Sequence, residues 1–414
     1  MRICIATDYY YPQLGGITEH VHGQARSLRA RGHDVTILTG RLLHAPPTSD
    51  RDDRPLADDD LEIVRMGVAM PLYGNGSQTL HTVIPGGRRA LRRFFRERRF
   101  DVVHVHAPYN PSSFMLVPFA LPADTIGVGT YHSVFTPGFV RDLVGPATHA
   151  SLKRLHGHVV VSQACIPPLS HYFPDLDYRV IPNGIDEEHF RPDAQRIEGL
   201  ADGKEPVILF VGRFDPRNGL GTMLEAFEQV WRAREGDARL WVVGDGPLRG
   251  YYERRLARDV ADAVHFAGRV DWNRPRYYAS ADVLCSPCLK ASFGMVLLEG
   301  MSCAVPIVAS RISGFELLVE HGREGLLVEP PDDPASFATG IERLLDAPAA
   351  RKRMGAEGRH TAVNSYAWHR VAGELEHLYR ELRGDQLAAV GPAADQGSAV
   401  TTTTSAVSST WVPS

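Results

Sequence analysis

Short apolar and β-branched runs alternate along almost the whole chain with longer segments in which apolar residues recur at helical spacing. Strands buried on both faces of a parallel sheet form continuous apolar runs of this kind, and the helices that cover the sheet are amphipathic. The alternation therefore predicts β-α-β units and parallel sheets. The first set of expected strands is 2–7, 34–39, 61–66, 101–106, 126–131, 158–162 and 178–181.

A second set of apolar runs begins after the polar segment 186–205, with expected strands at 206–212, 239–244, 264–267, 282–286, 305–310 and 325–328. Two sheets of this size each bury their own core, which predicts an α/β chain of two Rossmann-like, doubly wound domains. Ligands of such sheets bind beyond the carboxyl ends of the strands, so we expect the domains to face a central cleft. The expected units are an N-terminal domain 1–185, a C-terminal domain 186–367, a final helix 368–383 and a disordered tail 384–414.

Composition and charge narrow the function classes. The 414 residues carry 45 Lys and Arg against 49 Asp and Glu, and this net charge of −4 lacks the basic excess that nucleic-acid binding requires. The longest apolar stretch, 114–129, is interrupted by two prolines and Asp124, so no segment reaches the roughly 20 apolar residues of a membrane span. Asp8 comes too early for the apolar core of a signal peptide, which predicts a cytoplasmic location.

Five scattered cysteines do not indicate a disulfide framework in a chain of this length. Cys285 and Cys288 have the spacing of half a zinc site, but no second Cys or His pair stands nearby in the sequence. Two interpretations stay open: core or loop thiols, or a metal or redox site.

A dinucleotide-dependent dehydrogenase is the first alternative for a chain of repeated β-α-β units. Its fingerprint, Gly-x-Gly-x-x-Gly, should directly follow a strand. After the first strand the chain has only the pair Gly15-Gly16, and after the strand 239–244 Arg249 stands where the third glycine should be. The pattern argues against hydride transfer.

Three segments could bind an anion or a sugar nucleotide. Gly15-Gly16 would let a ligand approach the backbone beside a helix start, although a plain tight turn would also explain them. Arg213 directly follows an expected buried strand, where its guanidinium could bind a diphosphate or make a surface ion pair. Glu299 is the one carboxylate of the segment 290–301 and could accept hydrogen bonds from vicinal hydroxyls, or serve as a structural acid.

Taken in order, these motifs resemble the family 4 retaining glycosyltransferases of the GT-B fold, over about residues 1–382. Each motif is common by itself, but so many in the right order form a strong signal. The residues that carry the resemblance are Gly15-Gly16 with His20, 31–35, 101–106, 130–133, 161–162, 181–186, 211–213, 244–248, and 292–294 through Glu299.

The resemblance implies an N-terminal lobe for the acceptor, a C-terminal lobe for a nucleotide-sugar, and a final helix that crosses back to the first lobe. It also implies transfer of a hexosyl group with retention by front-face attack, in which the leaving phosphate helps to deprotonate the acceptor. No metal ion and no cofactor are expected besides the nucleotide-sugar co-substrate. GDP-mannose is the first expectation for that donor, and a UDP-hexose is the second.

Residue roles follow from the same resemblance. Arg213 is expected to bind the donor diphosphate and Glu299 the ribose, while His132 lies near the reacting centre. The other expected donor-binding residues are Gly15 and Gly16 beside the diphosphate, Val270 against the base, and Ser292, Phe293 and Gly294 against phosphate and sugar.

Two positions depart from the family pattern. The phosphate-binding Lys falls on Asn218, and the first Glu of the paired-acid motif falls on Ala291. A hydrogen bond to a charged partner contributes about 1.5–3 kcal/mol, so loss of the Lys alone could weaken binding roughly 10- to 150-fold. Our hypothesis is that Arg217 or Lys290, each next to an altered position, supplies the missing charge at the donor. The alternatives are a catalytically weak GT-B protein that binds nucleotide-sugar or lipid and, more remotely, a GT-B epimerase or phosphorylase.

A basic segment, 85–99, could contact an anionic membrane surface. Leu91, Phe94 and Phe95 have the spacing of a core-facing stripe, which would leave the arginines as a solvated face. The expected membrane-facing residues are Arg88, Arg89, Arg92, Arg93 and Arg96.

This region looks similar to the phosphatidylinositol mannosyltransferases, which use a basic helix here to sit on the inner leaflet. The expected acceptor-binding residues are Tyr9, His20 and Asn110. Leu80 and Pro137, however, stand where that group has an Arg and a Lys, so a lipid-linked or a small-molecule acceptor fits equally well. The expected location is cytoplasmic, with peripheral association at the inner face of the plasma membrane as a further expectation.

Overall fold

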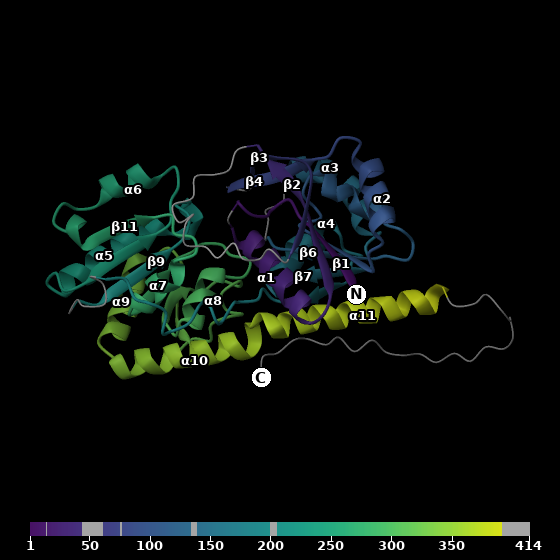
Figure 1. The fold of residues 1–414 in the computed structure, drawn as a ribbon. Helices are drawn as coiled ribbons and strands as arrows, with labels where there is room; N and C mark the ends of the chain where they lie inside the picture. Colours follow the sequence, from purple (N-terminus) through teal and green to yellow (C-terminus); the bar gives the residue numbers. More distant parts are fainter. Residues whose placement is uncertain (14, 44–60, 75–76, 134–138, 199–204, 391–414) are drawn as a thin grey trace.

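The structure is a computed structural model that describes residues 1–13, 15–43, 61–74, 77–133, 139–198 and 205–390. The chain forms two lobes, each built on one sheet, and they lie side by side in Figure 1 with the C-terminal lobe on the left. The expected α/β class with two doubly wound domains is confirmed.

The N-terminal lobe contains an eight-stranded sheet of order β4-β3-β2-β1-β5-β6-β7-β8. Neighbouring strands are parallel except β3 and β4. The strand order reverses at β1, which pairs with β2 on one side and β5 on the other. The strands are β1 (Arg2–Ala6), β2 (Asp34–Leu42), β3 (Glu62–Gly74), β4 (Ser77–Val83), β5 (Val102–His106), β6 (Ile126–Tyr131), β7 (Gly157–Val160) and β8 (Tyr178–Val180). The helices are α1 (Gly16–Ala30), α2 (Gly87–Arg98), α3 (Phe139–Leu152), α4 (Ile166–Tyr172) and the short 3-10 segments η1 (Ser113–Phe119) and η2 (Gln163–Cys165).

Strand β4 was not predicted. It pairs with an extension of β3 that runs to Gly74, eight positions past the expected end at Met66, in a register from Val68↔Val83 to Gly74↔Ser77. Polar residues dominate β4, so it lacks the apolar run that identified the other strands. The dipeptide Asn75-Gly76, a strong sequence signal for a hairpin, could have predicted this strand.

The C-terminal lobe contains a six-stranded parallel sheet of order β11-β10-β9-β12-β13-β14. Its strand order reverses at β9, between β10 and β12. The strands are β9 (Val207–Val211), β10 (Arg239–Val243), β11 (Val264–Gly268), β12 (Val283–Ser286), β13 (Ile307–Ser310) and β14 (Gly325–Val328). The helices are α5 (Leu220–Ala233), α6 (Arg249–Arg255), α7 (Arg274–Ser280), α8 (Met295–Ser302), α9 (Pro334–Leu345), α10 (Pro348–Tyr366) and the 3-10 segments η3 (Pro216–Asn218) and η4 (Ala261–Ala263). All expected strands of this lobe are present.

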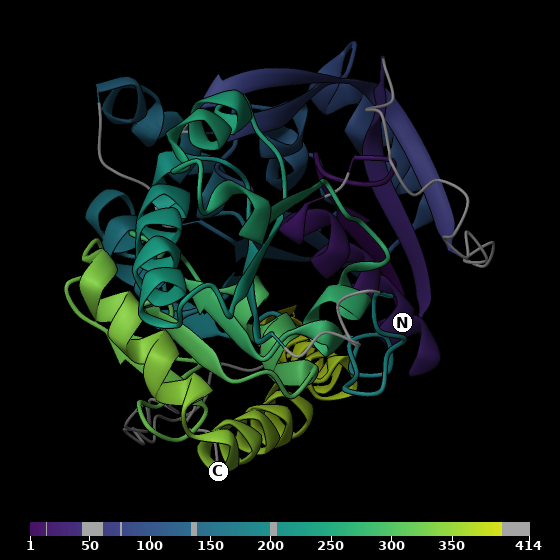
Figure 2. The ribbon, with the colours of Figure 1, turned by 90° about the vertical axis from the view of Figure 1, so that its left-hand side faces the viewer.

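Helices α10 and α11 (Trp368–Val390) follow one another along the base of both lobes (Figure 1). Figure 2 looks onto the C-terminal lobe, so that α11 is seen along its axis. Trp368 packs between the N-terminal core and two close glycines, because a Cβ at Gly23 or Gly184 would overlap its indole ring. The final helix therefore crosses back to the first lobe, as expected. It continues to Val390, which corrects the expected disordered start at 384; residues 391–414 lie outside the described part of the chain.

The five cysteines are free and buried. Burial raises the pKa of the Cys285 thiol and of the Cys288 thiol. Within the described residues, the side chains that could together hold a metal ion do not include a cysteine. These observations favour core thiols over a metal or redox site.

None of the helices in the described ranges is both long and apolar enough to cross a membrane.

Candidate active site

The two strands at which the sheet orders reverse, β1 and β9, each lead into a segment with expected site residues. Ligands of open α/β sheets bind at this kind of switch point, beyond the carboxyl ends of the strands. On the N-terminal side, the chain leaves β1 and enters α1 at Gly16. On the C-terminal side, it leaves β9 and reaches Arg213.

The glycine pair before α1 has an open backbone. Gly15 has φ 162° and ψ 163°, an extended conformation that any residue adopts. A Cβ at Gly15 or Gly16 would meet no atom of the described structure within 4 Å. Neither conformation nor crowding therefore requires glycine here, and close approach by a ligand becomes the better explanation than a tight turn.

Arg213 is exposed at the end of β9, and the structure places Asn218 against it. The amide nitrogen of Asn218 donates a hydrogen bond to the Arg213 carbonyl at 2.8 Å. Arg217 forms an ion pair with Asp215 at 3.3 Å and keeps 32% of its side chain exposed. A neutral amide thus holds the turn at the position where the resemblance led us to expect a lysine.

The loop after β12 returns to this same turn. Its backbone amide at Leu289 donates to the Arg217 carbonyl at 2.7 Å, and exposed Lys290 follows directly. The two cations named in our hypothesis therefore lie in neighbouring loops beside Asn218. Nothing in the geometry tests which of them contacts a donor.

The start of α8 requires glycine. Gly294 has φ +106°, and a Cβ there would lie 2.9 Å from the Phe315 ring. The loop residues before it differ in exposure: Phe293 is buried, whereas Ala291 and Ser292 are half-buried. Ser162, at the end of the N-terminal strand β7, donates its hydroxyl to the Ser292 carbonyl, so the loop also touches the opposite lobe.

Glu299 is buried on α8, with 5% of its side chain exposed. Tyr278 donates its hydroxyl to Glu299 Oε2 at 2.7 Å, and Arg274 donates to both carboxylate oxygens at 3.2 and 3.3 Å. Burial raises the pKa of Glu299, while the nearby Arg274 opposes this rise. The acid is therefore held by two donors in one orientation.

Arg274 also reaches the N-terminal lobe. Its Nη2 donates to Glu19 Oε1 at 2.7 Å, and Glu19 belongs to the first turn of α1. The sequence analysis assigned no role to Glu19, Arg274 or Tyr278. Arg274 is the first residue of α7, and it lies in the sequence between Gly268 and Tyr277. Nothing in this local sequence identifies its two distant acid partners.

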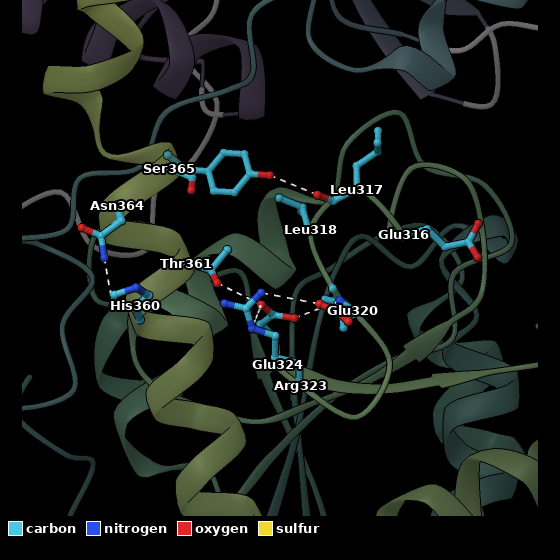
Figure 3. Close-up of a pocket in the computed structure, with 12 residues that line it drawn as sticks. Glu316, Leu317, Leu318, Glu320, Arg323, Glu324, His360, Thr361, Asn364 and Ser365 are labelled. Atoms are coloured by element: carbon cyan, nitrogen blue, oxygen red, sulfur yellow. Dashed lines mark hydrogen bonds and ion pairs between the residues drawn. The ribbon is translucent and has the colours of Figure 1, made fainter. Parts of the chain in front are cut away.

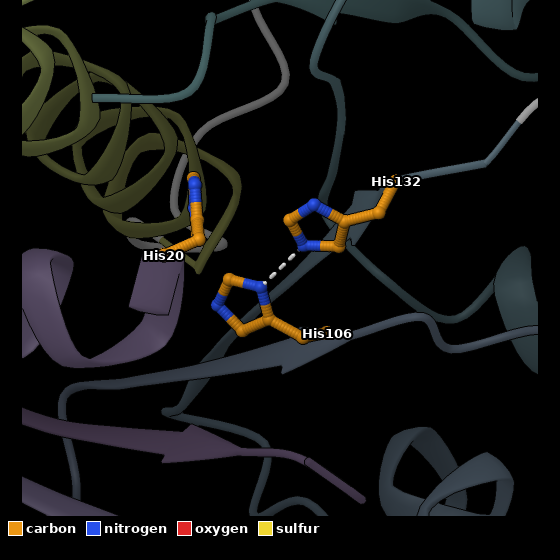
Figure 4. Close-up of side chains that lie close together, drawn as sticks. All are labelled: His20, His106 and His132. Carbon is orange, nitrogen blue, oxygen red and sulfur yellow. Dashed lines mark hydrogen bonds between the residues drawn. The ribbon is translucent and has the colours of Figure 1, made fainter. Parts of the chain in front are cut away.

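Three histidines cluster where α1, β5 and β6 meet (Figure 4). His106 Nδ1 and His132 Nε2 are 2.8 Å apart, and the His20 ring centroid lies 4.8 Å from that of His132. Burial lowers the pKa of His106 and of His132 well below the usual value, and it lowers the pKa of His20 to about 4. These imidazoles are therefore neutral at pH 7, and the structure groups His20 with His132.

The same three side chains have ligand atoms within 4.8 Å of one another, which is close enough to consider a metal ion. Two ring nitrogens bound to one tetrahedral zinc at 2.0–2.1 Å would be about 3.3 Å apart. The observed separation of 2.8 Å between His106 and His132 is instead that of a hydrogen bond. The geometry fits a hydrogen-bonded pair better than a metal centre, and the absence of a metal requirement stays a prediction.

Tyr9 and Asn110 lie together on the N-terminal lobe. The Asn110 amide donates to the Tyr9 hydroxyl at 3.3 Å. Burial and the neighbouring Asp8 raise the pKa of Tyr9. Asp8 is itself buried and accepts a hydrogen bond from the Thr82 amide of β4 at 2.8 Å. The strand that the sequence analysis missed thus helps to build the expected acceptor side.

A separate pocket of about 280 Å³ opens on the C-terminal lobe (Figure 3). It lies between the segment from Glu316 to Glu324 and the end of α10, near His360 and Asn364. None of the expected donor or acceptor residues lines it.

Helix α2 confirms the core-facing stripe, because Leu91, Phe94 and Phe95 are buried. Arg92 is half-buried, and the exposed membrane-facing residues of the prediction are Arg88, Arg89, Arg93 and Arg96. Arg88 and Arg92 donate to the Phe119 carbonyl at 3.1 and 3.3 Å. The helix thus has a buried apolar side and an outer face rich in arginine.

Comparisons with known proteins agree with this architecture. The family model described as Glycosyltransferase Family 4 matches residues 14–189, and the one described as Glycosyl transferases group 1 matches residues 205–347. Phosphatidyl-myo-inositol mannosyltransferase of Mycobacterium tuberculosis is 31% identical, over 93% of this chain and 98% of the relative. A GDP-mannose-dependent alpha-(1-6)-phosphatidylinositol monomannoside mannosyltransferase of Mycolicibacterium smegmatis is 28% identical, over 89% of this chain and 88% of the relative.

Solved structures share the fold. Sucrose-phosphate synthase from Thermosynechococcus elongatus superposes with a TM-score of 0.67 at 22% identity, covering 93% of this chain and all of that one. HepE from Anabaena, solved with UDP, gives a TM-score of 0.71 at 16% identity, covering 92% of this chain and all of that one. Both lobes of the chain and their order are thus those of known glycosyltransferases. The chain belongs to glycosyltransferase family 4 and is a hexosyltransferase of the GT-B fold.

Proposed function

We propose that the enzyme transfers mannose from GDP-mannose, with retention of configuration, to a hydroxyl of a lipid-linked acceptor. The observation that carries the proposal is the buried carboxylate of Glu299 on α8, which is held by Arg274 and Tyr278 of α7 and is linked through Arg274 to Glu19 in the first turn of α1. The relatives named for GDP-mannose and phosphatidylinositol support the choice of sugar and acceptor class. A UDP-hexose is the second candidate donor.

The donor occupies the C-terminal lobe in this proposal. Exposed Arg213 binds the diphosphate, and Glu299 accepts hydrogen bonds from the ribose hydroxyls. The backbone at half-buried Val270 contacts the base. Ser292 and Gly294, which precede the first turn of α8, bind phosphate and sugar through backbone amides. The open Gly15-Gly16 backbone faces the diphosphate from the other lobe.

The departure at Asn218 is offset by a neighbouring cation. Arg217 and Lys290 lie in adjacent loops that share a backbone hydrogen bond, so either side chain can approach a phosphate in front of Asn218. This keeps a positive charge at the diphosphate without the family lysine. The alternative interpretation of Asn218 and Ala291 is a catalytically weak protein that only binds nucleotide-sugar.

His132 stands near the reacting centre as a neutral imidazole. Burial keeps its pKa well below the usual value, so at pH 7 it accepts or donates a hydrogen bond without carrying charge. It suits a sugar hydroxyl better than a phosphate. Retention then follows from attack on the face that the leaving phosphate occupies, with the phosphate accepting the acceptor proton. The reaction proposed here uses no metal ion.

The acceptor binds the N-terminal lobe near Tyr9 and Asn110, and α2 holds the enzyme at an anionic membrane surface. Each basic residue near such a surface contributes about 1 kcal/mol of attraction. The exposed residues Arg89, Arg93 and Arg96 supply this charge on one face of α2. Peripheral association with the inner face of the plasma membrane would place lipid acceptors beside Tyr9.

A thermal-shift screen with GDP-mannose, UDP-glucose and UDP-N-acetylglucosamine tests the donor. A ligand at 100 times its Kd stabilises a protein by about 2.7 kcal/mol, which a melting curve resolves. We expect a shift with GDP-mannose that is lost in Arg213→Ala and in Glu299→Ala. A shift with uridine nucleotides alone would move the assignment to a UDP-hexose.

Turnover under saturating donor separates the enzyme from a binding protein. The assay follows mannose transfer from labelled GDP-mannose to lipid extracts and to soluble polyols, with product stereochemistry read by nuclear magnetic resonance. Donor binding without transfer to any acceptor would favour the binding protein. An inverted product would overturn the retaining mechanism.

A further inference from the structure

We propose that Arg274 is a positioning residue of the donor site. Its guanidinium orients the Glu299 carboxylate toward the ribose of the nucleotide-sugar, and Glu19 of the opposite lobe holds the guanidinium in that orientation. The inference rests on the assignment of Glu299 to the ribose in the proposed function. No motif of the sequence singles out Arg274.

The guanidinium of Arg274 is almost fully engaged. It donates from Nε and Nη2 to the two oxygens of Glu299, from Nη2 to Glu19 and from Nη1 to the Asp271 carbonyl at 3.1 Å. Only 14% of the side chain is exposed, and the group stacks 5.7 Å above the Phe190 ring. A planar fork with fixed donors defines the direction of a carboxylate more strictly than a single ammonium would.

The remaining acceptor capacity of Glu299 fits one further donor. An ionised carboxylate offers about four lone-pair positions. Tyr278 and Arg274 Nε occupy those of Oε2, and Arg274 Nη2 takes one of those of Oε1. The open position is therefore on Oε1, where a ribose hydroxyl can donate. Rotation of the carboxylate would lose this arrangement, so its orientation decides ribose affinity.

The shortest contact of Arg274 crosses between the lobes. Its distance to Glu19 is 2.7 Å, against 3.2 and 3.3 Å to the Glu299 oxygens. Glu19 lies three positions after Gly16, and Asp271 follows Val270 directly. One guanidinium thus ties together the turns that are proposed to meet the diphosphate, the base and the ribose.

Charge supports the same arrangement. Burial disfavours the ionised form of Glu299, and the positive charge of Arg274 opposes this. Glu19 shares the Arg274 guanidinium with Glu299, and its hydrogen bond holds the guanidinium between the two acids. Replacement of Arg274 by a neutral residue would leave two neighbouring acids without their shared cation, and Glu299 would lose its fixed direction.

Calorimetric titration of the full-length protein with GDP and with 2′,3′-dideoxy-GDP tests the inference, because the second probe lacks both ribose hydroxyls. We expect Arg274→Gln to weaken GDP binding about 10- to 100-fold and to change dideoxy-GDP binding less than twofold. Glu299→Gln should show the same pattern. The variant that combines Arg274→Gln and Glu299→Gln should bind GDP as tightly as whichever single variant has the lower affinity. Arg276→Gln, on the same helix, is the matched control and should bind both probes like wild type.

Glu19→Gln is a milder variant for the case in which Arg274→Gln does not fold. It should weaken GDP binding about three- to tenfold on its own, and where Arg274→Gln does fold, it should have no further effect in that background. In turnover, both substitutions should raise the donor KM more than they lower kcat.

The possible results distinguish the ribose role of Glu299 from the positioning role of Arg274. If wild type binds GDP and dideoxy-GDP equally, the ribose role of Glu299 in the proposed function fails. If wild type prefers GDP and Arg274→Gln keeps that preference, only the present inference fails. Tighter GDP binding in Arg274→Gln would also overturn it, because Arg274 would then compete with the ribose. Equal loss for both probes would reduce Arg274 to a structural role.

Discussion

Both lobes have a glycine turn near the strand at which the sheet order reverses, but the two turns contain glycine for different reasons. After β10, the neighbour of β9 in the sheet, a Cβ at Gly244 would overlap the carbonyl of Gly212, and Gly244 has φ +139°. After β1, the backbone at Gly15 and Gly16 is extended or helical and a Cβ would meet open space. The C-terminal turn needs glycine to fold, whereas the N-terminal turn leaves room for something that the described chain does not supply.

The lobes also differ in what they bury. Among the described residues, the C-terminal lobe buries acids such as Glu299 and Glu324 but no histidine. The N-terminal lobe buries a group of histidines that includes His20, His104 and His106. The lobe that is proposed to bind the acceptor therefore carries buried histidines, which gain a proton as pH falls below 7, and it should lose more stability in mild acid than the other lobe.

Acid should destabilise the N-terminal lobe first, and this is the largest effect that we expect. Burial lowers the folded-state pKa of His20 and His158 to about 4 and that of His104 to about 3. Because these values lie below the unfolded value of about 6.5, the stabilising neutral form is complete above pH 6.5 and is lost as pH falls toward 4. Each group contributes up to about 1.4 kcal/mol per pH unit, so the three together contribute up to about 4 kcal/mol per pH unit.

Hydrogen exchange followed by mass spectrometry at pH 7, 6 and 5 can measure the stability of each lobe separately. Protection of β5, β6 and β7 should fall with pH, while that of β9 and β12 should stay nearly constant. A His20→Asn variant should show a shallower pH dependence than wild type. Equal loss of protection in both lobes would break this part of the comparison.

Glycine substitutions sharpen the comparison of the two turns. Gly244→Ala should lower the free energy of unfolding by about 2–4 kcal/mol, because the methyl group overlaps backbone and the φ angle is strained. Gly15→Ala should leave it within about 0.5 kcal/mol but weaken donor binding. Gly32→Ala, at φ +87° in open space, is the control for backbone strain alone and should cost about 1 kcal/mol.

Urea denaturation and nucleotide titration of the same variants give both readouts. Loss of stability in Gly15→Ala would mean that its turn, too, is a folding requirement. Unchanged donor binding in that variant would remove the reason for a ligand at the N-terminal turn.

Apolar runs were sufficient to predict every strand of the described ranges except β4, and strands such as β5, β6 and β12 are buried on both faces. β4 pairs with the extension of β3 at the sheet edge, and two of its buried residues, His81 and Thr82, are polar. The end of α11 was misplaced because Gly384 interrupts the helical pattern. Both errors lie at the margin of the N-terminal lobe, where burial constrains the sequence least.

Only those residues of the candidate site that belong to a recognisable sequence motif could be predicted. Glu299 and Arg213 stand in segments whose order along the chain is diagnostic. Arg274 was missed because its two acid partners lie 255 and 25 positions away in the sequence. The hydrogen bond between His106 and His132 follows from the adjacency of β5 and β6, but their neutral state depends on burial that a sequence does not display.

The hypothesis that Arg217 or Lys290 supplies the missing positive charge predicts a working donor site in the C-terminal lobe. Arg217→Ala with Lys290→Ala should weaken GDP-mannose binding about 10- to 150-fold, since a hydrogen bond to a charged phosphate is lost. Arg254→Ala with Lys352→Ala removes the same charges from exposed positions of the same lobe and serves as control. Wild-type affinity and turnover in the first variant would sink the hypothesis.

The smallest expected effect concerns the outer faces of the two lobes. On α6 and beside it, arginines are matched by acids, as in the pairs Arg249–Glu253 and Arg255–Glu225. On α2 the acid Glu97 pairs with Arg93, while Arg89 and Arg96 are exposed on the same helix. Positive charge is therefore more concentrated on α2 than on α6.

Sedimentation with vesicles of phosphatidylcholine and phosphatidylserine tests whether this charge binds membrane. Arg89→Glu with Arg96→Glu should weaken binding about tenfold or more, because each basic residue near anionic lipid contributes about 1 kcal/mol. The effect should shrink as salt rises, since screening shortens the range of surface charge. Arg254→Glu with Arg258→Glu, the matched reversal on the C-terminal lobe, should leave binding unchanged. Equal losses for both reversals would show that net charge alone, and not the α2 face, attracts the enzyme to lipid.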